Sequence, residues 1–217
     1  MIRPFTFNEV LLLLGAVKWT LALSAIAFLG GALMGLTVAL ARTSDNRALR
    51  FGAAAYIQVF QGTPLLMQLF LVFFGATVIG FEVDPWTAAA LGLTLNAGAF
   101  LGEIWRGCIQ AVPKGQWEAA SALGLGYVDR MVSIILPQAA KIAIPPTVGF
   151  LVQLIKSTSL AAIIGFAELT RTGQLVNNAT FRPFLVFGIV AAIYFALCWP
   201  LSLLSARLER RAAAPTR

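Results

Sequence analysis

The feature that most constrains this sequence is a series of five long stretches with almost no charged residues. The stretches run for 18 to 31 residues, and only one of them is interrupted by a charge, at Lys156. An α-helix needs about 20 apolar residues to cross the hydrocarbon core of a bilayer. The sequence therefore predicts an all-α integral membrane protein, a single domain over residues 1–217. Its five transmembrane helices are expected at residues 16–41, 53–80, 85–106, 139–166 and 183–206.

Composition and charge support a membrane protein and predict its orientation. Hydrophobic residues make up 59% of the chain and charged residues 12%, against about 45–50% and about 25% in soluble domains. The net charge of +7 therefore indicates topology rather than nucleic-acid binding, because Lys and Arg collect on the cytoplasmic side. Eleven of the sixteen basic residues fall after the first, third and fifth predicted helices. The N-terminus is expected outside and the C-terminus in the cytoplasm.

A cleaved signal peptide is the alternative interpretation of the N-terminal region. Ala39-Leu40-Ala41 matches the small-x-small pattern of a cleavage site. A signal peptide, however, has a basic region before an apolar stretch of about 7–15 residues. Here the first basic cluster follows the apolar stretch, so the sequence favours a retained helix.

One segment between the third and fourth predicted helices differs in character from the rest. Pro113 and Gly115 should end the preceding helix, good helix formers follow, and Gly124 suits a helix terminus. The sequence predicts a short cytoplasmic helix at residues 116–125. Two interpretations remain open from the residues alone. The helix either presents itself to a partner protein or lies on the lipid headgroups with Trp117 as its anchor.

The motif in this segment resembles the signature loop of membrane subunits of binding-protein-dependent ABC importers. Glu118-Ala119-Ala120 is followed after three residues by Gly124 and, after nine more, by Ile134-x-Leu136-Pro137. Further motifs resemble the polar amino-acid branch of these permeases (histidine, glutamine, glutamate, arginine and opine types). They are Gly62-Thr63-Pro64-Leu65-Leu66, Leu95-Asn96-Ala97-Gly98-Ala99-Phe100, Val112-Pro113-Lys114-Gly115-Gln116, Leu136-Pro137-Gln138-Ala139 and Lys156-Ser157-Thr158-Ser159-Leu160. Two residues depart from this branch: Gln61 replaces a common arginine and Ser157 a common acidic residue.

The resemblance implies a fold and a set of partners. Such permeases have five core helices per subunit, a type I ABC importer permease fold, and assemble as dimers in the bacterial inner membrane. Their signature loop forms a coupling helix that sits on a cytoplasmic ATPase subunit. Two such ATPases and an extracytoplasmic solute-binding protein complete the importer. By this resemblance the ATPase-coupling residues are Glu118, Ala119, Ala120, Gly124 and Pro137.

The chain is expected to be the passive part of such an importer. It has no Gly-x4-Gly-Lys-Ser/Thr phosphate loop, so ATP and Mg²⁺ should be used by the partner subunit. No enzymatic activity, bound cofactor or metal site is expected of the chain itself. It also contains no histidine, which removes imidazole ligands and bases. The alternative function is a secondary transporter driven by an ion gradient, although the chain shows no clear internal repeat.

Polar residues within the predicted helices are candidates for the solute path. Lys156 falls in the outer half of the fourth helix, where it either faces a wet cavity or extends to the outer headgroups. Asn96 and Glu103 share one helix face, as do Gln61 and Gln68, and packing between helices is the alternative in both cases. For a zwitterionic solute, Lys156 would meet the carboxylate and Glu103 the amine. The full set of candidates is Gln61, Gln68, Asn96, Glu103, Gln153, Lys156, Thr158 and Ser159.

Overall fold

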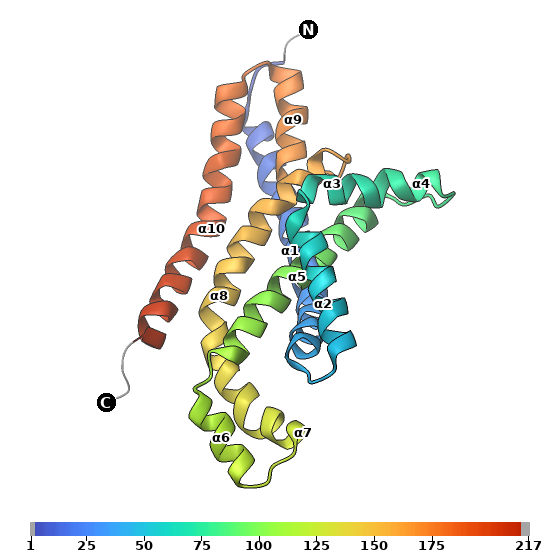
Figure 1. Cartoon of the computed structure of the whole chain (residues 1–217). Helices are drawn as coiled ribbons and strands as arrows, with labels where there is room; N and C mark the ends of the chain where they lie inside the picture. Colours follow the sequence, from blue (N-terminus) through green and yellow to red (C-terminus); the bar gives the residue numbers. More distant parts are fainter. Residues whose placement is uncertain (1–2, 214–217) are drawn as a thin grey trace.

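The computed structural model describes residues 3–213, which form an elongated bundle of helices with no strand among them (Figure 1). The helix α1 (Phe7–Thr43) and the helix α10 (Pro183–Ala213) both begin at the end that carries the N-terminus. The short helix α6 (Lys114–Ala122) lies at the opposite end. The all-helical prediction is confirmed. With 37 residues, α1 is about 55 Å long, longer than the predicted span 16–41.

The centre of the bundle is the seam between α1 and α5 (Pro85–Gln110). Glycines on both helices let the two backbones approach closely, as small residues do in membrane helix pairs. A Cβ atom built on Gly31 would lie 2.5 Å from the Cβ of Ala97, and one on Gly35 would lie 2.9 Å from the Cβ of Leu101. No side chain larger than hydrogen fits at either position of α1.

The second predicted span, 53–80, is not a single helix. The chain turns by 103° between residues 62 and 65, where Thr63 and Pro64 are both extended. Proline lacks an N–H and clashes with the preceding turn, so it ends a helix readily. The sequence predicts one span that Pro64 kinks, and the structure instead has a break at this residue. The pieces are α2 (Arg47–Gly62), α3 (Leu65–Phe70), the π-helical turn η1 (Leu71–Gly75) and α4 (Ala76–Val78).

The fourth predicted span begins earlier than residue 139. A nearly continuous helix runs from Tyr127 into the membrane and carries a π-helical turn just before Pro137. The π-helix is rare and occurs mostly as a single turn inserted within an α-helix, as it does here. The pieces are α7 (Tyr127–Arg130), η2 (Met131–Ile135), α8 (Leu136–Ser157) and the 3₁₀ turn η3 (Thr158–Ala162).

One helix was not predicted from the sequence. The helix α9 (Leu169–Thr180) lies beside the first part of α1 and the start of α10 (Figure 1). The backbone N–H of Leu169 donates to the hydroxyl of Thr20 on α1 at 3.2 Å. The many polar residues of α9 exclude it from the long apolar stretches by which the membrane helices are predicted.

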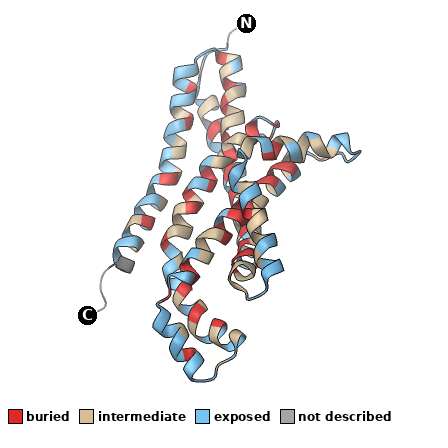
Figure 2. Ribbon diagram, viewed as in Figure 1, coloured by how far each residue is buried: buried red, intermediate tan, exposed pale blue. Residues whose placement is uncertain are grey.

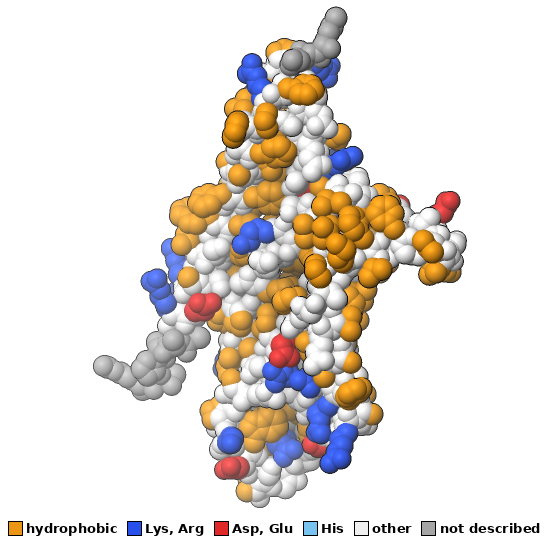
Figure 3. Space-filling model, turned by 45° about the horizontal axis from the view of Figure 1, so that its top comes forward, with side chains coloured by type: hydrophobic (Ala, Val, Ile, Leu, Met, Phe, Trp, Pro, Cys, Tyr) orange, Lys and Arg blue, Asp and Glu red, His pale blue; other side chains and the backbone are white. Residues whose placement is uncertain are grey.

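The surface of the bundle suits a bilayer. Within residues 3–213, four helical stretches are long and apolar enough to cross a membrane, and the bent pair of α2 with α3–α4 would make a fifth. Buried residues concentrate where the central helices meet, whereas α10 is largely exposed (Figure 2). Hydrophobic side chains spread over the visible face, and many Lys and Arg side chains gather toward its lower end (Figure 3).

Candidate functional site

A polar cavity of about 150 Å³ lies where α2, α5 and α8 meet, beside the break at Pro64. It brings together three of the predicted path residues, Gln61, Asn96 and Gln153, from three different helices. Amide and hydroxyl groups supply its polarity, and none of the lining side chains is charged. The lining residues are Phe60, Gln61, Thr63, Leu65, Asn96, Phe100, Phe150, Gln153, Leu154 and Ser157.

Gln68 holds the wall of this cavity in place rather than lining it. Its side chain is 6% exposed, and its Nε2 donates to the carbonyl oxygen of Phe60 at 2.8 Å and to the hydroxyl of Thr63 at 2.9 Å. Its Oε1 accepts from Nδ2 of Asn96 at 3.0 Å. Gln68 therefore bonds to backbone oxygen that the broken helix leaves free and joins α3 to α5, since buried polar groups are costly when unpaired.

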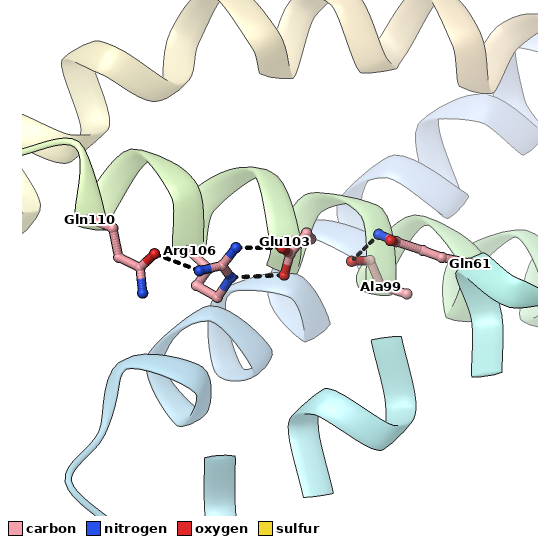
Figure 4. Close-up of polar contacts among 5 residues, drawn as sticks. All are labelled: Gln61, Ala99, Glu103, Arg106 and Gln110. Atoms are coloured by element: carbon pink, nitrogen blue, oxygen red, sulfur yellow. Dashed lines mark hydrogen bonds and ion pairs between the residues drawn. The ribbon is translucent and has the colours of Figure 1, made fainter. Parts of the chain in front are cut away.

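A polar stripe continues along α5 from the cavity toward the C-terminal end of that helix (Figure 4). Nε2 of Gln61 donates to the carbonyl oxygen of Ala99 at 3.4 Å. One turn further, Glu103 forms an ion pair with Arg106, and Arg106 also donates to Gln110. Arg106 was not among the predicted path residues. A Glu and an Arg three residues apart on one helix face were the available signal.

Lys156 does not line the polar cavity. Lys156 lines a separate cavity of about 250 Å³ between α8 and α10, with Tyr194 and Trp199 among its neighbours. The hydroxyl of Thr158 donates to the carbonyl of Ile155 at 2.8 Å, and that of Ser159 donates to the carbonyl of Lys156 at 2.7 Å. These hydroxyls satisfy their own helix. The structure does not bring Lys156 and Glu103 to one site, because α8 turns the lysine toward α10.

The segment predicted as the coupling helix is α6, which begins two residues earlier than expected and ends at Ala122. Gly124 follows with a φ of +73°. Its N–H donates to the carbonyl of Ser121, and the N–H of Leu125 donates to that of Ala120. This pattern is a Schellman motif, in which a residue with positive φ ends the helix. The prediction of Gly124 as the terminator is confirmed at the level of backbone geometry.

A small number of side-chain contacts connect α6 to the rest of the bundle. The guanidinium of Arg130 lies 5.6 Å from the ring centre of Trp117 and 5.9 Å from that of Tyr127, and it donates to the hydroxyl of Ser121 at 2.7 Å. The hydroxyl of Tyr127 donates to the carbonyl of Thr43 at the end of α1. Arg130 thus connects α6 to α7, and α7 connects to α1.

The five predicted coupling residues lie in different environments. Glu118 and Ala119 are exposed on α6, as are Gly124 after it and Pro137 at the start of α8. Ala120 is only 1% exposed and faces its own chain. Its small side chain therefore lets α6 seat against the bundle, and it is not available to a partner in this arrangement.

A buried carboxyl group was missed by the sequence analysis. Glu168 is fully buried and forms the N-cap of α9 by accepting from the backbone N–H of Arg171 at 2.8 Å. The hydroxyl of Tyr194 on α10 donates to its second oxygen at 2.7 Å. An acidic residue directly before a short amphipathic segment was the available signal. The group organises the packing of α9 and α10.

Two larger cavities have a different character. One of about 470 Å³ lies between α5 and α8, and one of about 820 Å³ lies between α1, α2 and α7. Both are lined mainly by apolar side chains, which suits acyl chains better than a polar solute. Among residues 3–213 no group of three or more Cys, Asp or Glu side chains could hold a metal ion.

Comparison with known proteins places this geometry in context. Residues 27–214 match the family model described as the binding-protein-dependent transport system inner membrane component. The chain is 40% identical over 197 residues to a probable amino-acid ABC transporter permease protein, YckA, of Bacillus subtilis, covering 91% of this chain and 87% of that protein. It is 40% identical over 201 residues to the L-cystine transport system permease protein TcyB of the same species (92% and 86% covered).

Similarity extends to another species and to solved structures. The chain is 36% identical over 202 residues to the glutamine transport system permease protein GlnP of Escherichia coli, with 92% of each covered. It superimposes on the crystal structure of an amino acid ABC transporter with histidines with a TM-score of 0.89 and 36% identity, over 94% of this chain and 96% of that one. The inward-facing MetNI methionine ABC transporter gives a TM-score of 0.81 at 19% identity, over 97% and 100%, and shows the fold alone.

Proposed function

The chain belongs to the family of binding-protein-dependent transport system inner membrane components, and from this membership we propose that it is the permease subunit of an ABC importer of polar amino acids. The polar cavity between α2, α5 and α8 is the observation that carries the substrate class. Its lining offers amide and hydroxyl groups beside three phenylalanines and no charge. Such a cavity accepts a small solute with hydrogen-bonding groups. Relatives described as transporting amino acids, glutamine and L-cystine support this cargo.

The energy for transport comes from a separate ATPase in this proposal. The sequence has no phosphate-binding loop of the P-loop type, so ATP and Mg²⁺ are used by the partner. The exposed Glu118 and Ala119 of α6 contact that ATPase, and the Schellman motif at Gly124 fixes the shape of the contact. A solute-binding protein delivers the solute from outside.

A second permease chain, identical or related, completes the path in this proposal. In a single chain the cavity residues Gln61 and Gln153 are exposed, and the stripe residues Glu103 and Arg106 are partly exposed. Two cytoplasmic ATPases complete the proposed complex. The distribution of basic residues supports an inner-membrane orientation with the N-terminus outside and α6 in the cytoplasm.

Reconstitution tests the proposal directly. The permease, its ATPase and its solute-binding protein are placed in liposomes, and uptake of radiolabelled amino acids is measured with and without ATP. We expect ATP-dependent uptake of polar amino acids, and we expect Asn96→Leu and Gln153→Leu to reduce it while the complex still assembles. Gln58→Leu is the control, because Gln58 is exposed on α2 and lies outside the cavity. Uptake that follows an ion gradient without the ATPase would contradict the proposal.

A further inference from the structure

The two sides of α5 differ sharply in chemistry. Trp105, Cys108 and Ile109 line the apolar cavity of about 470 Å³ on one side. On the other side lies a polar stripe, whose members follow at intervals of seven, three and four residues, the spacing of one helix face. They are Asn96, Glu103, Arg106 and Gln110. Polar contacts follow this stripe from Gln61 to Gln110 (Figure 4). The stripe leads away from the neutral cavity toward the cytoplasm.

The charged part of this stripe is the pair formed by Glu103 and Arg106. Nε of Arg106 donates to one carboxylate oxygen of Glu103 at 2.8 Å, and Nη2 donates to the other. The arginine side chain is 21% exposed and the glutamate side chain 33%. It is the one ion pair within 4.0 Å among residues 3–213. Both side chains are therefore partly accessible at the surface of the single chain.

The position of the pair along α5 disfavours contact with lipid. Glu103 is seven residues beyond Asn96 and seven before the end of α5, which places it about 10 Å from each at 1.5 Å per residue. Ionisable groups at such positions are costly against lipid and usually face a cavity or a partner. The apolar side of α5 faces α8 across the cavity of about 470 Å³, whereas the pair lies on the other side of α5 and is partly exposed. We therefore infer that the pair faces the solute path.

We propose that Glu103 and Arg106 form a second solute site, which receives the α-ammonium and α-carboxylate groups of the amino acid after it leaves the neutral cavity. This inference rests on the proposed function. The Glu103 carboxylate binds the ammonium group and the Arg106 guanidinium binds the carboxylate in two parallel hydrogen bonds, the geometry that favours arginine over lysine.

The chemistry of the pair matches that of a zwitterion. In the empty site the charges of Glu103 and Arg106 neutralise each other, which lowers the cost of partly burying them. When a zwitterion enters between them, each protein charge exchanges one opposite charge for another, and the net charge of the site does not change. A solute with a single charge would leave either Glu103 or Arg106 unpaired. The pair therefore selects α-amino acids as a class, whereas the neutral cavity faces their side chains.

Binding measurements with truncated solutes test this site. The probes are the amino acid that the wild-type complex imports best, the amine that lacks its α-carboxylate and the acid that lacks its α-ammonium. Their affinities for the purified permease–ATPase complex are measured by titration calorimetry without the solute-binding protein. We expect the wild type to bind the amino acid about tenfold or more tightly than either analogue, since hydrogen bonds to charged groups are strong.

Each single substitution should remove the affinity difference between the amino acid and one of the two analogues. The Arg106→Gln variant should bind the amino acid and the carboxylate-free amine with similar affinity. The Glu103→Gln variant should bind the amino acid and the ammonium-free acid with similar affinity. Lys141→Gln is the control, because Lys141 is exposed on α8 and belongs to none of the cavities. If the single variants do not assemble, the double variant Glu103→Gln/Arg106→Gln leaves no unpaired charge and should lose both discriminations.

Other outcomes would overturn the site. Wild-type discrimination in the double amide variant would show that the pair has only a structural role. A wild-type complex that imports the amino acid but does not bind it more tightly than the analogues would also reject the inference. In both cases import itself is intact, so the proposed function survives. Absence of amino-acid import by the wild type would instead reject the proposed function.

Discussion

The α1–α5 seam and the α6 segment both depend on glycine, but for opposite reasons. At Gly31 and Gly35 the space is filled, and any Cβ atom would meet α5 at 2.9 Å or less. At Gly124 a Cβ atom would meet nothing within 4 Å, and the backbone φ of +73° is what requires glycine. The seam thus depends on close packing, whereas α6 depends on the shape of its own terminus.

This difference indicates how the two regions move. A seam in which two backbones touch along several turns behaves as one body, because packed interiors deform little. The helix α6 has one buried side chain, Ala120. It is held by the contacts of Arg130, by a hydrogen bond from Gln138 to Gln116 and by the packing of Trp117. We therefore expect α6 to transmit force as a small rigid unit at the end of a rigid frame. The two regions should respond differently to the same substitution.

The largest effect is expected from Gly35→Val in the seam. The added side chain would overlap Leu101 and the backbone of Gly102, and overpacking costs about 1–3 kcal/mol or more. We expect a large loss of folded protein in membranes and a lower thermal unfolding temperature of the purified complex. Gly15→Val is the matched control on the same helix, since nothing lies within 4 Å of its Cβ position. Equal behaviour of the two variants would show that the seam is not closely packed.

A smaller and more local effect is expected from Gly124→Val. A non-glycine residue in the left-handed region costs about 1–2 kcal/mol, and a β-branched one fits it especially poorly. The membrane level of the chain should stay normal, while recovery of the ATPase with the permease and ATP-dependent uptake should both fall. Gly126→Val is the control, because Gly126 has a φ of −62°. Normal coupling in the Gly124 variant would remove the main support for α6 as the coupling helix.

A further, weaker effect is expected from Arg130→Gln, which removes the contacts between the Arg130 guanidinium and α6. The arginine contacts the rings of Trp117 and Tyr127, and a partly exposed cation–π contact contributes about 0.5–1 kcal/mol. Fluorescence of a probe attached at Glu118→Cys should report greater mobility of α6, with the unfolding temperature nearly unchanged. Arg207→Gln, exposed on α10, is the control. An immobile α6 in the Arg130 variant would show that other contacts hold it.

The sequence predicted the parts of the molecule that depend on local patterns. Charge-free stretches gave most of the spans, and the short helix before Gly124 followed from helix formers between breakers. The 103° turn at Pro64 could not be predicted, because it requires Gln68 to bond across the break to Phe60 and Thr63. The direction of Lys156 depends on how α8 is rotated against α10, and no local pattern encodes that rotation. Arg106, in contrast, could have been predicted, because its partner Glu103 lies three residues away on the same helix.

The smallest effect concerns Asp84, which caps the end of α5 opposite to α6. Its carboxylate accepts from the hydroxyl of Thr87 at 2.6 Å and from the backbone N–H groups of Thr87 and Trp86. These bonds, that from the Thr87 hydroxyl first, lower the pKa of Asp84 below its ordinary value of 3.8. A carboxylate with a lowered pKa stabilises the folded state above the unfolded pKa, and this contribution is lost as the pH falls through the folded pKa.

The variant Asp84→Asn tests this cap because asparagine retains an N-cap oxygen without the charge. We expect its unfolding temperature to be slightly below that of the wild type at pH 7, and the difference to shrink as the pH falls below 3.8. Asp84→Ala should lower the unfolding temperature at both pH values, since it removes the cap itself. A difference between Asp84→Asn and the wild type that stays constant with pH would show that the charge of Asp84 does not stabilise the start of α5. At that end the seam between α1 and α5 would then be stabilised by packing alone, whereas α6 depends on the backbone conformation of Gly124.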